Sequence, residues 1–317
     1  MKLALAGDTM LGRGVAAELE SVPPESLFSD EVVAAAREAD LFVLNLECCI
    51  SERGSRWPDP QKPFFFRAPP AAVQTLTHLG VDCVTLANNH ALDFGIEALL
   101  DTLDLLAAAD IAVVGAGTDF DQASSPALLD AEGLSIAVIG VADHPADFAA
   151  GPDRPGIAFV DLRRGVPDWL LGTVRGVDAD VVLVTPHWGP NMVVDPVRHV
   201  REAAAALIQA GATLIAGHSA HVFHGVDGRV VYDLGDFIDD YAVDPVLRND
   251  LGLLFLIDLD ERGPRELEAI PLELDYCRTR LATGGDLAWI HRRFQAACAA
   301  FGTDVTTRDG RLVVRWR

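Results

Sequence analysis

Short apolar runs rich in Val, Ile and Leu alternate with longer alanine-rich stretches over the first two thirds of the chain. The apolar runs predict strands at residues 3–6, 41–46, 83–87, 111–114, 135–141, 181–185 and 214–216. The alanine-rich stretches predict helices at residues 30–38, 71–79, 96–109 and 198–210. Several of the strands are apolar at nearly every position, so both faces of their sheet should be covered. This pattern predicts an α/β fold.

The pattern changes after Gly217. Short strands are predicted at residues 230–233, 253–259 and 270–275, with turns between them and no helix of comparable length. They predict a second, more antiparallel sheet. A helix over about 286–301 and a short strand at 312–315 are expected to close the chain. Two sheets face to face with helices outside would satisfy the whole pattern, and no linker is clear enough to divide the chain.

Five short polar motifs each follow one of the apolar runs. They are Ala-Gly-Asp-Thr-Met-Leu-Gly-Arg at 6–13, Asn-Leu-Glu at 45–47, Asn-Asn-His at 88–90, Pro-His-Trp-Gly at 186–189 and Gly-His-Ser-Ala-His at 217–221. In an open α/β sheet the carboxyl ends of the strands share one edge, where ligands bind. These motifs should therefore converge in space although they span more than 200 residues. They predict a metal site or an acid–base site.

The first three motifs offer oxygen ligands and one imidazole. Asp8 could hold a cation or cap a helix. Glu47 directly follows an apolar run and is costly to bury alone, so we expect either a metal ion or an ion pair beside it. Asn89 could reach a cation while His90 reaches a substrate, with Asp93 orienting the His90 ring. In the alternative interpretation, His90 caps a helix and Asp93 is solvated.

The last two motifs supply histidines. His187 follows the strand at 181–185 and could be a metal ligand or a satisfied core residue. His218 and His221 follow the next strand, where a short turn could aim both at one pocket. Asp236 follows a further strand and could orient a histidine. The remaining histidines lack this placement and receive no role: His78, His144, His199, His224 and His291.

Composition narrows the possible partners. The net charge is −22 and the pI about 4.6, which disfavours nucleic-acid binding, although a local cation site or a simple solubility role remains open. No apolar run reaches the ~18 residues of a membrane span. The apolar stretch at residues 1–6 is short for a signal peptide and fits a first core strand, so we expect a cytoplasmic protein with no membrane partner.

A proline-rich loop at residues 51–70 separates two of the predicted elements. Its aromatic side chains could contact a substrate or cover the core. Four basic side chains in this loop could give the site a basic mouth: Arg53, Arg56, Lys62 and Arg67.

Taken together, these motifs resemble the CapA family, named for capsular poly-γ-glutamate synthesis, from residue 7 to about 256. The signatures are the motifs at 7–13, 45–47, 87–95 and 217–222. The resemblance implies a calcineurin-like metallophosphoesterase fold, a four-layer α-β-β-α sandwich of two mixed sheets with helices outside. It implies a single domain over residues 1–317, in which 260–317 is a C-terminal extension that the resemblance does not cover.

The resemblance also implies roles for individual residues. Metal-site roles fall on Asp8, Glu47, Asn89, His187 and His218. Roles in proton transfer or substrate binding fall on His90 and His221, with Asp93 and Asp236 as their partners.

Three departures from the phosphoesterase pattern affect the expected metal. Met10 stands where that pattern has a histidine, Asn-Leu-Glu replaces its Gly-Asp pair, and Gly-His-Ser-Ala-His is one residue longer than its Gly-His-x-His. The remaining ligands are rich in oxygen and suit one Mn²⁺, Mg²⁺ or Ca²⁺ per site at least as well as a zinc pair.

We therefore expect a metal-dependent acid–base enzyme acting on a peptide or polyamide. Its most specific form would be Cα epimerisation of a ribosomally made peptide, because lasso-peptide epimerases share the CapA-like framework. The alternatives are a metal-dependent phosphoester hydrolase and a non-catalytic component of poly-γ-glutamate synthesis. The sequence determines neither the substrate nor the oligomeric state.

Overall fold

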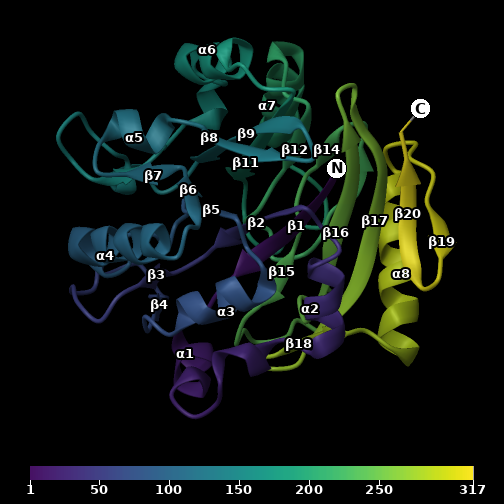
Figure 1. The fold of residues 1–317 in the computed structure, drawn as a ribbon, viewed down its shortest axis with the longest axis horizontal. Coiled ribbons are helices and arrows are strands. Elements are labelled where there is room, and N and C mark those ends of the chain that lie inside the picture. The colour runs from purple at the N-terminus through teal and green to yellow at the C-terminus, as the bar shows by residue number, and fades with distance from the viewer. Residues whose placement is uncertain (317) are drawn as a thin grey trace.

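Residues 1–316 are described by a computed structural model, in which two mixed β-sheets stack between layers of helices (Figure 1). The first sheet has the strand order β19-β20-β17-β16-β1-β2-β5-β6, with β15 beside β1 and β18 beside β17. These strands are β1 (Lys2–Thr9), β2 (Leu41–Leu46), β5 (Cys83–Thr85), β6 (Ala112–Val114), β15 (Asp236–Ile238), β16 (Leu251–Asp260), β17 (Gly263–Leu274), β18 (Thr279–Leu281), β19 (Thr306–Arg308) and β20 (Arg311–Arg315).

The second sheet has the strand order β13-β14-β12-β11-β9-β8. Its strands are β8 (Ala127–Ala131), β9 (Leu134–Ala142), β11 (Val181–His187), β12 (Leu214–Ala216), β13 (Val226–Asp227) and β14 (Val230–Val231). Two small ribbons lie apart from both sheets, one of β3 (Cys49–Ile50) with β4 (Arg67–Ala68) and one of β7 (Ala116–Gly117) with β10 (Gly156–Ile157).

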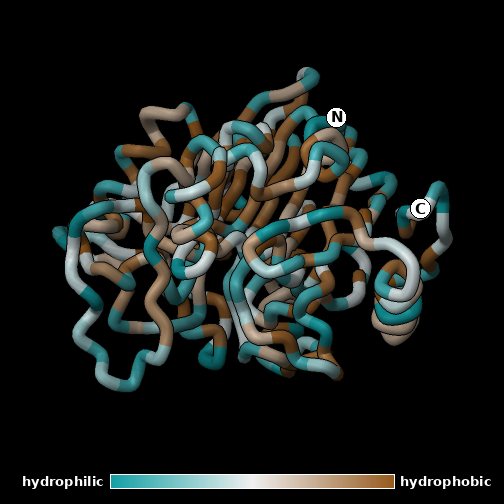
Figure 2. The backbone as a smooth tube through the Cα atoms, turned by 90° about the horizontal axis from the view of Figure 1, so that it is seen from below, coloured by the Kyte–Doolittle hydropathy of each residue, from teal (hydrophilic) through white to brown (hydrophobic). Residues whose placement is uncertain are grey.

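Three apolar clusters separate the four layers. On β1, Leu3 and Leu5 face the second sheet, while Ala4 and Ala6 face the helices of the first sheet. This alternation is what a strand covered on both faces requires. The hydrophobic segments accordingly concentrate in the central strands (Figure 2). The prediction of a four-layer sandwich of two mixed sheets with helices outside is confirmed.

Helices cover the outer face of each sheet. On the first sheet lie α1 (Arg13–Leu19), α2 (Asp30–Ala36), α3 (Ala72–Leu79) and α4 (Gly95–Ala108). On the second lie α6 (Asp168–Gly176) and α7 (Arg198–Ala210), with α5 (Phe120–Ser124) at its margin. Short 3₁₀ turns complete the set, namely η1 (Pro24–Leu27), η2 (Ala146–Phe148) and η3 (Leu162–Arg164). Within residues 1–316 no helix has the length and apolar character needed to cross a bilayer. The cytoplasmic location stays a prediction.

The predicted place of two of the three strands after Gly217 is wrong. The strands predicted at 253–259 and 270–275 do not form the second sheet, because β16 pairs antiparallel with β1 and β17 with β16, so that they extend the first sheet. The strand predicted at 230–233 does belong to the second sheet, where β14 pairs with β12 and β13. The second sheet is built instead from residues 127–231. Of the residues beyond 260, β17 to β20 join the first sheet. Helix α8 (Gly284–Ala299) packs Ile290 and Phe294 into the cluster between the sheets. Arg317 lies outside the described residues.

Gly7 permits the close approach that places β1 beside β15. A Cβ on Gly7 would lie 1.8 Å from the Gly235 carbonyl oxygen, which also accepts a hydrogen bond of 2.9 Å from the Asp8 amide. We expect Gly7→Ala to lower the free energy of unfolding by about 3 kcal/mol or more, because the obstructing atom belongs to the backbone. Chemical denaturation would measure this loss.

Gly172 provides the matched control for this substitution. It lies within α6, where a Cβ would meet no heavy atom within 4 Å in the described part of the chain. Gly172→Ala should therefore raise the free energy of unfolding by roughly 0.5–1 kcal/mol. Equal effects of the two substitutions would contradict the steric argument.

Candidate metal and acid–base site

The strand ends that carry the five motifs meet between the two sheets. Asp8 pairs in register with Asn45 of β2 on one side and with Asp236 of β15 on the other. In the second sheet, His187 and His218 form a bridge at the ends of β11 and β12. The ends of strands from both sheets therefore bring these residues together at one position in the fold.

Asp8 lies at the centre of this position and is fully buried. Its carboxylate can share a cation with Glu47 and His187, since the three ligand atoms lie within 4.8 Å of one another. The same holds for Asp8 with His221 and Asp236. His218 is also adjacent, with its Nδ1 3.5 Å from Asp8 Oδ1.

Several ligand atoms of this cluster are buried without a hydrogen-bond partner among residues 1–316. They are Glu47 Oε1, His187 Nδ1 and Asp236 Oδ2, and Asn89 Oδ1, in the motif that carries His90, is also buried without a partner. Leaving such atoms unpaired is costly, and native proteins rarely do so without an ion, a water or a functional reason. Their types, mainly carboxylate and amide oxygens with imidazole nitrogen, fit a divalent cation.

The charges of the cluster agree with this fit. Burial raises the pKa of Glu47 well above its ordinary range, and the neighbouring charge of Asp8 adds to the effect. Burial also raises the pKa of Asp236 well above its usual value and that of Asp239 to about 6. Burial opposes ionisation of Asp8 too, but the His218 and His221 imidazoles outweigh it and hold the Asp8 pKa well below normal. A bound cation would relieve this concentration of buried negative charge.

A chain of amides orients Asp8. Asn45 Nδ2 donates to Asp8 Oδ1 at 2.7 Å, and Asn88 Nδ2 donates to Asn45 Oδ1 at 2.9 Å. Asn88 Oδ1 in turn accepts from the His90 amide at 3.0 Å. Sequence reasoning emphasised Asn89 and missed this role of Asn88. The two adjacent amides differ in their contacts, since Asn88 is hydrogen-bonded to Asn45 and His90, whereas Asn89 Oδ1 has no partner among residues 1–316.

His90 is held by a hydrogen bond to Asp93 and by an aromatic ring that stacks on the face of its imidazole. Its Nδ1 lies 2.6 Å from Asp93 Oδ2, and the Phe66 ring stacks on it with centroids 3.9 Å apart. Asp93 is fully buried, so the interpretation of Asp93 as a solvated residue is wrong. Burial lowers the pKa of His90 to about 4, despite the opposing charge of Asp93. His90 is therefore neutral at pH 7, and Nε2 is available as a proton acceptor when the Nδ1–H donates its hydrogen bond to Asp93.

Asp93 also anchors the loop at residues 51–70. It accepts a hydrogen bond of 2.6 Å from the Phe66 amide, and its Oδ1 lies 3.0 Å from Lys62 Nζ. We expect Asp93→Asn to lower the free energy of unfolding by about 3 kcal/mol, because Lys62 would stay nearly buried without its counter-charge. Urea denaturation would measure this loss.

The double variant Lys62→Met with Asp93→Asn tests the cause. It removes the uncompensated cation and should recover most of the stability lost in Asp93→Asn. A double variant as unstable as the single one would show that the Asp93 hydrogen bonds, rather than the ion pair, carry the stability.

His221 is held by a second carboxylate on the other side of the cluster. Its Nδ1 lies 2.8 Å from Asp236 Oδ1 and 3.2 Å from Asp8 Oδ2, and its Nε2 is 3.1 Å from Asn191 Nδ2. Burial opposes protonation of His221. The charges of Asp236 and Glu47 outweigh it and raise the His221 pKa well above its ordinary value. The two imidazoles thus differ in charge, as an acid and base pair requires.

His90 and His221 both line one cavity with room for about 300 Å³. The Tyr241 hydroxyl, also at this cavity, donates to Glu47 Oε2 at 3.0 Å. Arg13 Nη2 lies 3.1 Å from Asp240 Oδ1, and the guanidinium rests over aromatic rings of the cavity wall. Sequence reasoning assigned no role to Arg13, Tyr241 or Asn191. Arg13 lies within a signature motif, which is the signal that could have identified it.

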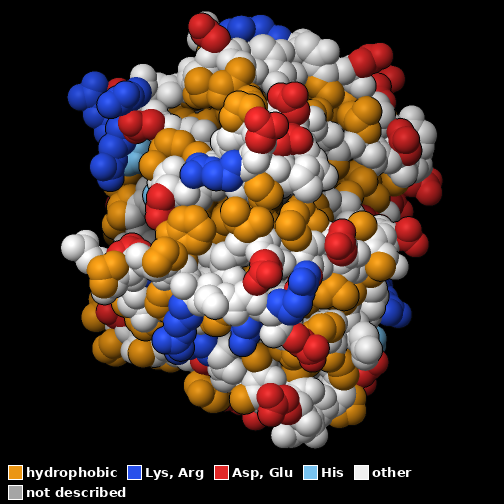
Figure 3. Space-filling view, turned by 90° about the vertical axis from the view of Figure 1, so that its left-hand side faces the viewer, with side chains coloured by type: hydrophobic (Ala, Val, Ile, Leu, Met, Phe, Trp, Pro, Cys, Tyr) orange, Lys and Arg blue, Asp and Glu red, His pale blue; other side chains and the backbone are white. Residues whose placement is uncertain are grey.

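The aromatic side chains of the loop at residues 51–70 divide between the cavity and the core. Phe64 and Phe66 line the cavity, whereas Trp57 packs on Phe148. Of the loop's basic side chains, Lys62 reaches the site and Arg53 pairs with Asp101, whereas Arg56 lies over Phe65 of the loop and Arg67 over Phe94 at the start of α4. On the face where β3, β4 and α4 lie, Lys and Arg side chains gather in a few groups despite the acidic total (Figure 3).

The chain is similar to several known bacterial proteins. The model of the family described as bacterial capsule synthesis protein PGA_cap matches residues 2–241. A probable polyglutamine synthesis accessory protein of Mycobacterium tuberculosis is 32% identical over 294 residues, covering 86% of this chain and 76% of its own. The PGA biosynthesis protein CapA of Bacillus subtilis is 28% identical over 280 residues, covering 86% and 72%.

Two solved structures share the fold. A phosphatase from Mycoplasma pneumoniae aligns with a TM-score of 0.55 at 14% identity, over 87% of this chain and 94% of its own. A hypothetical protein from Thermus thermophilus aligns with a TM-score of 0.51 at 16% identity, over 87% and 100%. At these identities the likeness concerns the fold alone.

Proposed function

The chain belongs to the bacterial capsule synthesis protein family, and from that premise we propose that it is a metal-dependent enzyme that moves protons on a peptide or polyamide substrate. In its most specific form the reaction inverts a Cα centre. One observation carries the proposal. His90 and His221, each held by its own carboxylate, line the same cavity beside a cluster of buried ligand atoms without partners.

The proposed ligands of the cation are Asp8, Glu47, Asn89, His187 and His218. Oxygen dominates this set, which supports Mn²⁺, Mg²⁺ or Ca²⁺ over a zinc pair. Met10 is buried, and its sulfur lies 3.1 Å from the Gly12 amide, so this position offers no imidazole to a second ion. We therefore propose one cation per site. When bound, it would stabilise negative charge that develops on a carbonyl oxygen next to the reacting carbon.

The proton steps follow from the two histidines. His90, neutral and held by Asp93, removes the Cα proton, and the electron pair of that bond moves toward the adjacent carbonyl. His221, protonated and held by Asp236, returns a proton to the opposite face of Cα. Each imidazole then exchanges its proton with solvent to restore the starting state. The names of the relatives, which refer to polyglutamine and PGA synthesis, support a polyamide substrate.

Phosphoester hydrolysis is the second candidate. Asp8 belongs to both groups of close ligand atoms, and a carboxylate shared in this way could bridge two ions. In that reaction His90 or His221 would protonate the leaving alkoxide. A non-catalytic role in polymer synthesis is the third candidate, supported by the accessory role in the name of one relative.

One experiment separates the three candidates. Protein loaded with Mn²⁺, Mg²⁺ or Ca²⁺ is incubated in D₂O with γ-linked glutamate oligomers and with α-linked peptides. Mass spectrometry then reports deuterium at Cα, and chiral analysis after acid hydrolysis reports inversion. A parallel reaction measures p-nitrophenol release from bis(p-nitrophenyl) phosphate. A double variant, His90→Gln with His221→Gln, is the control.

The outcomes are distinct. Deuterium uptake that is lost in the double variant supports the proposal. Release of p-nitrophenol without deuterium uptake favours hydrolysis instead. Oligomer binding with neither activity would favour the non-catalytic role and overturn the proposal of an enzyme.

A further inference from the structure

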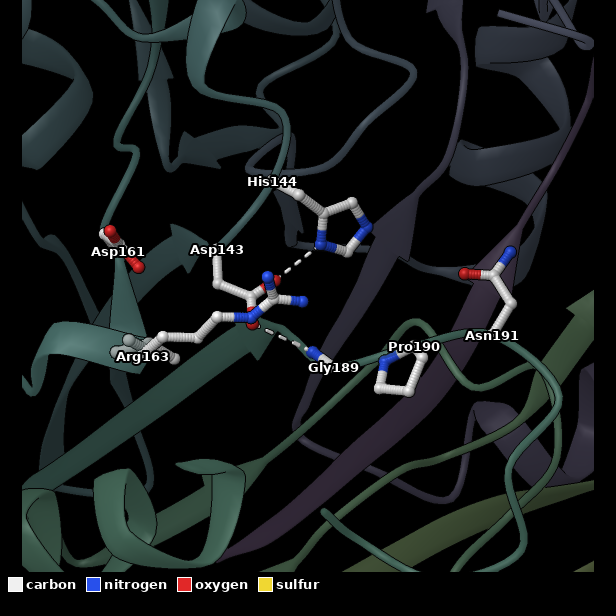
Figure 4. A pocket seen from close by; sticks show the side chains of 8 residues that line it. Asp143, His144, Asp161, Arg163, Gly189, Pro190 and Asn191 are labelled. Carbon is white, nitrogen blue, oxygen red and sulfur yellow. Dashed lines mark hydrogen bonds and ion pairs between the residues drawn. The ribbon is translucent and has the colours of Figure 1, made fainter. Parts of the chain in front are cut away.

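A second pocket adjoins the cavity of the two histidines. It has room for about 410 Å³ and is lined by Asp143, His144, Asp161, Leu162, Arg163, Gly189, Pro190 and Asn191 (Figure 4). Asn191 lines both pockets, and its amide contacts His221. The His144 ring lies 5.2 Å from the His187 ring between centroids. The second pocket therefore borders the ligand cluster where His144 lies against His187.

Both carboxylates of this pocket already have partners. Asp143 binds His144 Nδ1, accepts from the Gly189 amide at 3.0 Å and lies 3.4 Å from His199 Nε2. Asp161 lies 3.1 Å from Arg164 Nε. Because these acids are satisfied within the protein, neither is an open site for a cation.

Arg163 is the exception among the charged residues here. Its guanidinium forms no ion pair with any residue described by the structure, and Figure 4 draws its extended side chain among the residues that line the pocket. His144 is fixed by Asp143 through one ring nitrogen, and the other points away from Asp143. The pocket thus presents one open cation and one free imidazole nitrogen, in a chain with net charge −22. This chemistry suits a carboxylate.

We propose that this pocket is a second arm of the substrate site, in which Arg163 binds a free carboxylate along an acidic polyamide chain. This inference rests on the proposed function, because the reacting residue would lie in the first cavity between His90 and His221. The chain would pass Asn191 on its way between the two arms. The substrate would then be an acidic polymer several residues long, and a single amino acid would engage one arm alone.

Binding of γ-linked glutamate oligomers of two to ten units, fluorescently labelled and followed by anisotropy, tests the proposal without turnover. We expect Arg163→Gln to weaken binding of the longer oligomers on the order of tenfold. Binding of oligomers too short to span both arms should stay unchanged. The length dependence distinguishes an arm from a general loss of positive charge.

Arg175→Gln is the control, since it removes the same charge at an exposed arginine of α6 that lines neither pocket. It should change affinity less than twofold at any length. Three outcomes would each overturn the second arm. They are equal effects of the two variants on affinity, an effect of Arg163→Gln that does not depend on oligomer length, and no oligomer binding to the wild type. Deuterium uptake with unaltered oligomer binding in Arg163→Gln would leave the proposed function standing while removing the arm. Length-dependent binding without deuterium uptake would support the second arm and count against the proposed proton-transfer reaction.

Discussion

Glu47→Gln is expected to abolish the thermal stabilisation that Mn²⁺ gives the protein and, at the same time, to stabilise the metal-free form. Glu47 is fully buried beside Asp8, and one of its oxygens has no partner within residues 1–316. Glutamine keeps an acceptor for the Tyr241 hydroxyl but removes the charge. Affinity for the cation should fall at least about 100-fold. The metal-free variant should gain roughly 1–4 kcal/mol, because the folded protein no longer has to bury a carboxylate beside Asp8 or to keep it protonated there.

The stability gained in Glu47→Gln should also depend on pH, which provides a second test of the same prediction. Burial and Asp8 raise the pKa of Glu47 in the folded protein, so the folded state keeps a proton that the unfolded chain has already released. A raised pKa of this kind costs stability as the pH rises above the ordinary glutamate pKa of about 4.3, and the gain from Glu47→Gln should grow with pH until the pH passes the pKa of Glu47 in the folded protein. Asp236 and Asp239 act in the same direction and Asp8 in the opposite one, but all three are common to both proteins.

Calorimetry with and without Mn²⁺, together with metal analysis of the purified proteins, measures both effects. Glu20→Gln serves as the control, since Glu20 is an exposed acid after α1, and it should alter neither the metal-dependent shift nor its pH profile. A Glu47→Gln protein that keeps the full Mn²⁺-dependent shift would remove Glu47 from the ligand set.

Local patterns identified the strands and helices well. The bounds of β2, β12 and α7 match the predicted ranges, because an apolar run or an amphipathic helix depends on its own residues. Helix α1 was missed although α2, of the same seven residues, was predicted, because α1 begins with Arg-Gly at the end of the polar motif and lacks the serine cap of α2. The sheet assignment of β16 and β17 failed for another reason. An alternating strand shows which face is buried, but its pairing partner is chosen by residues far away in the chain.

The same distinction applies to the site. Asp8, Glu47, His187, His218 and His221 could be selected because each follows a buried strand, and the rule for strand ends then brings them together. The structure places them within one cluster. Residues that reach the site from loops could not be found in this way. Arg163 and Asn191 follow no strand pattern, and their place depends on how the loops at residues 143–165 and 188–197 fold over the sheet edge.

The two histidines should fail in different ways when each is replaced. We expect His90→Gln and His221→Gln each to lower the rate of Cα inversion about 10²- to 10⁴-fold, the usual contribution of one acid or base. Exchange of the Cα proton with solvent should survive in both. If the imidazoles face opposite sides of the substrate, the one that remains can still remove and return a proton on its own side. Each variant would then exchange one epimer of the substrate and spare the other.

Deuterium uptake from D₂O, measured separately for the L and D forms of one oligomer, reads out this asymmetry. His78→Gln is the control, because His78 lies on α3 in the outer layer and contributes to neither pocket. His221 also contacts Asp8, so the Mn²⁺-dependent thermal shift must be measured in His221→Gln to show that the cation still binds. Loss of exchange for both epimers in both variants, with the cation retained, would mean that the histidines act on one face. The geometry of the cavity would then favour hydrolysis, in which one face suffices for protonating a leaving group.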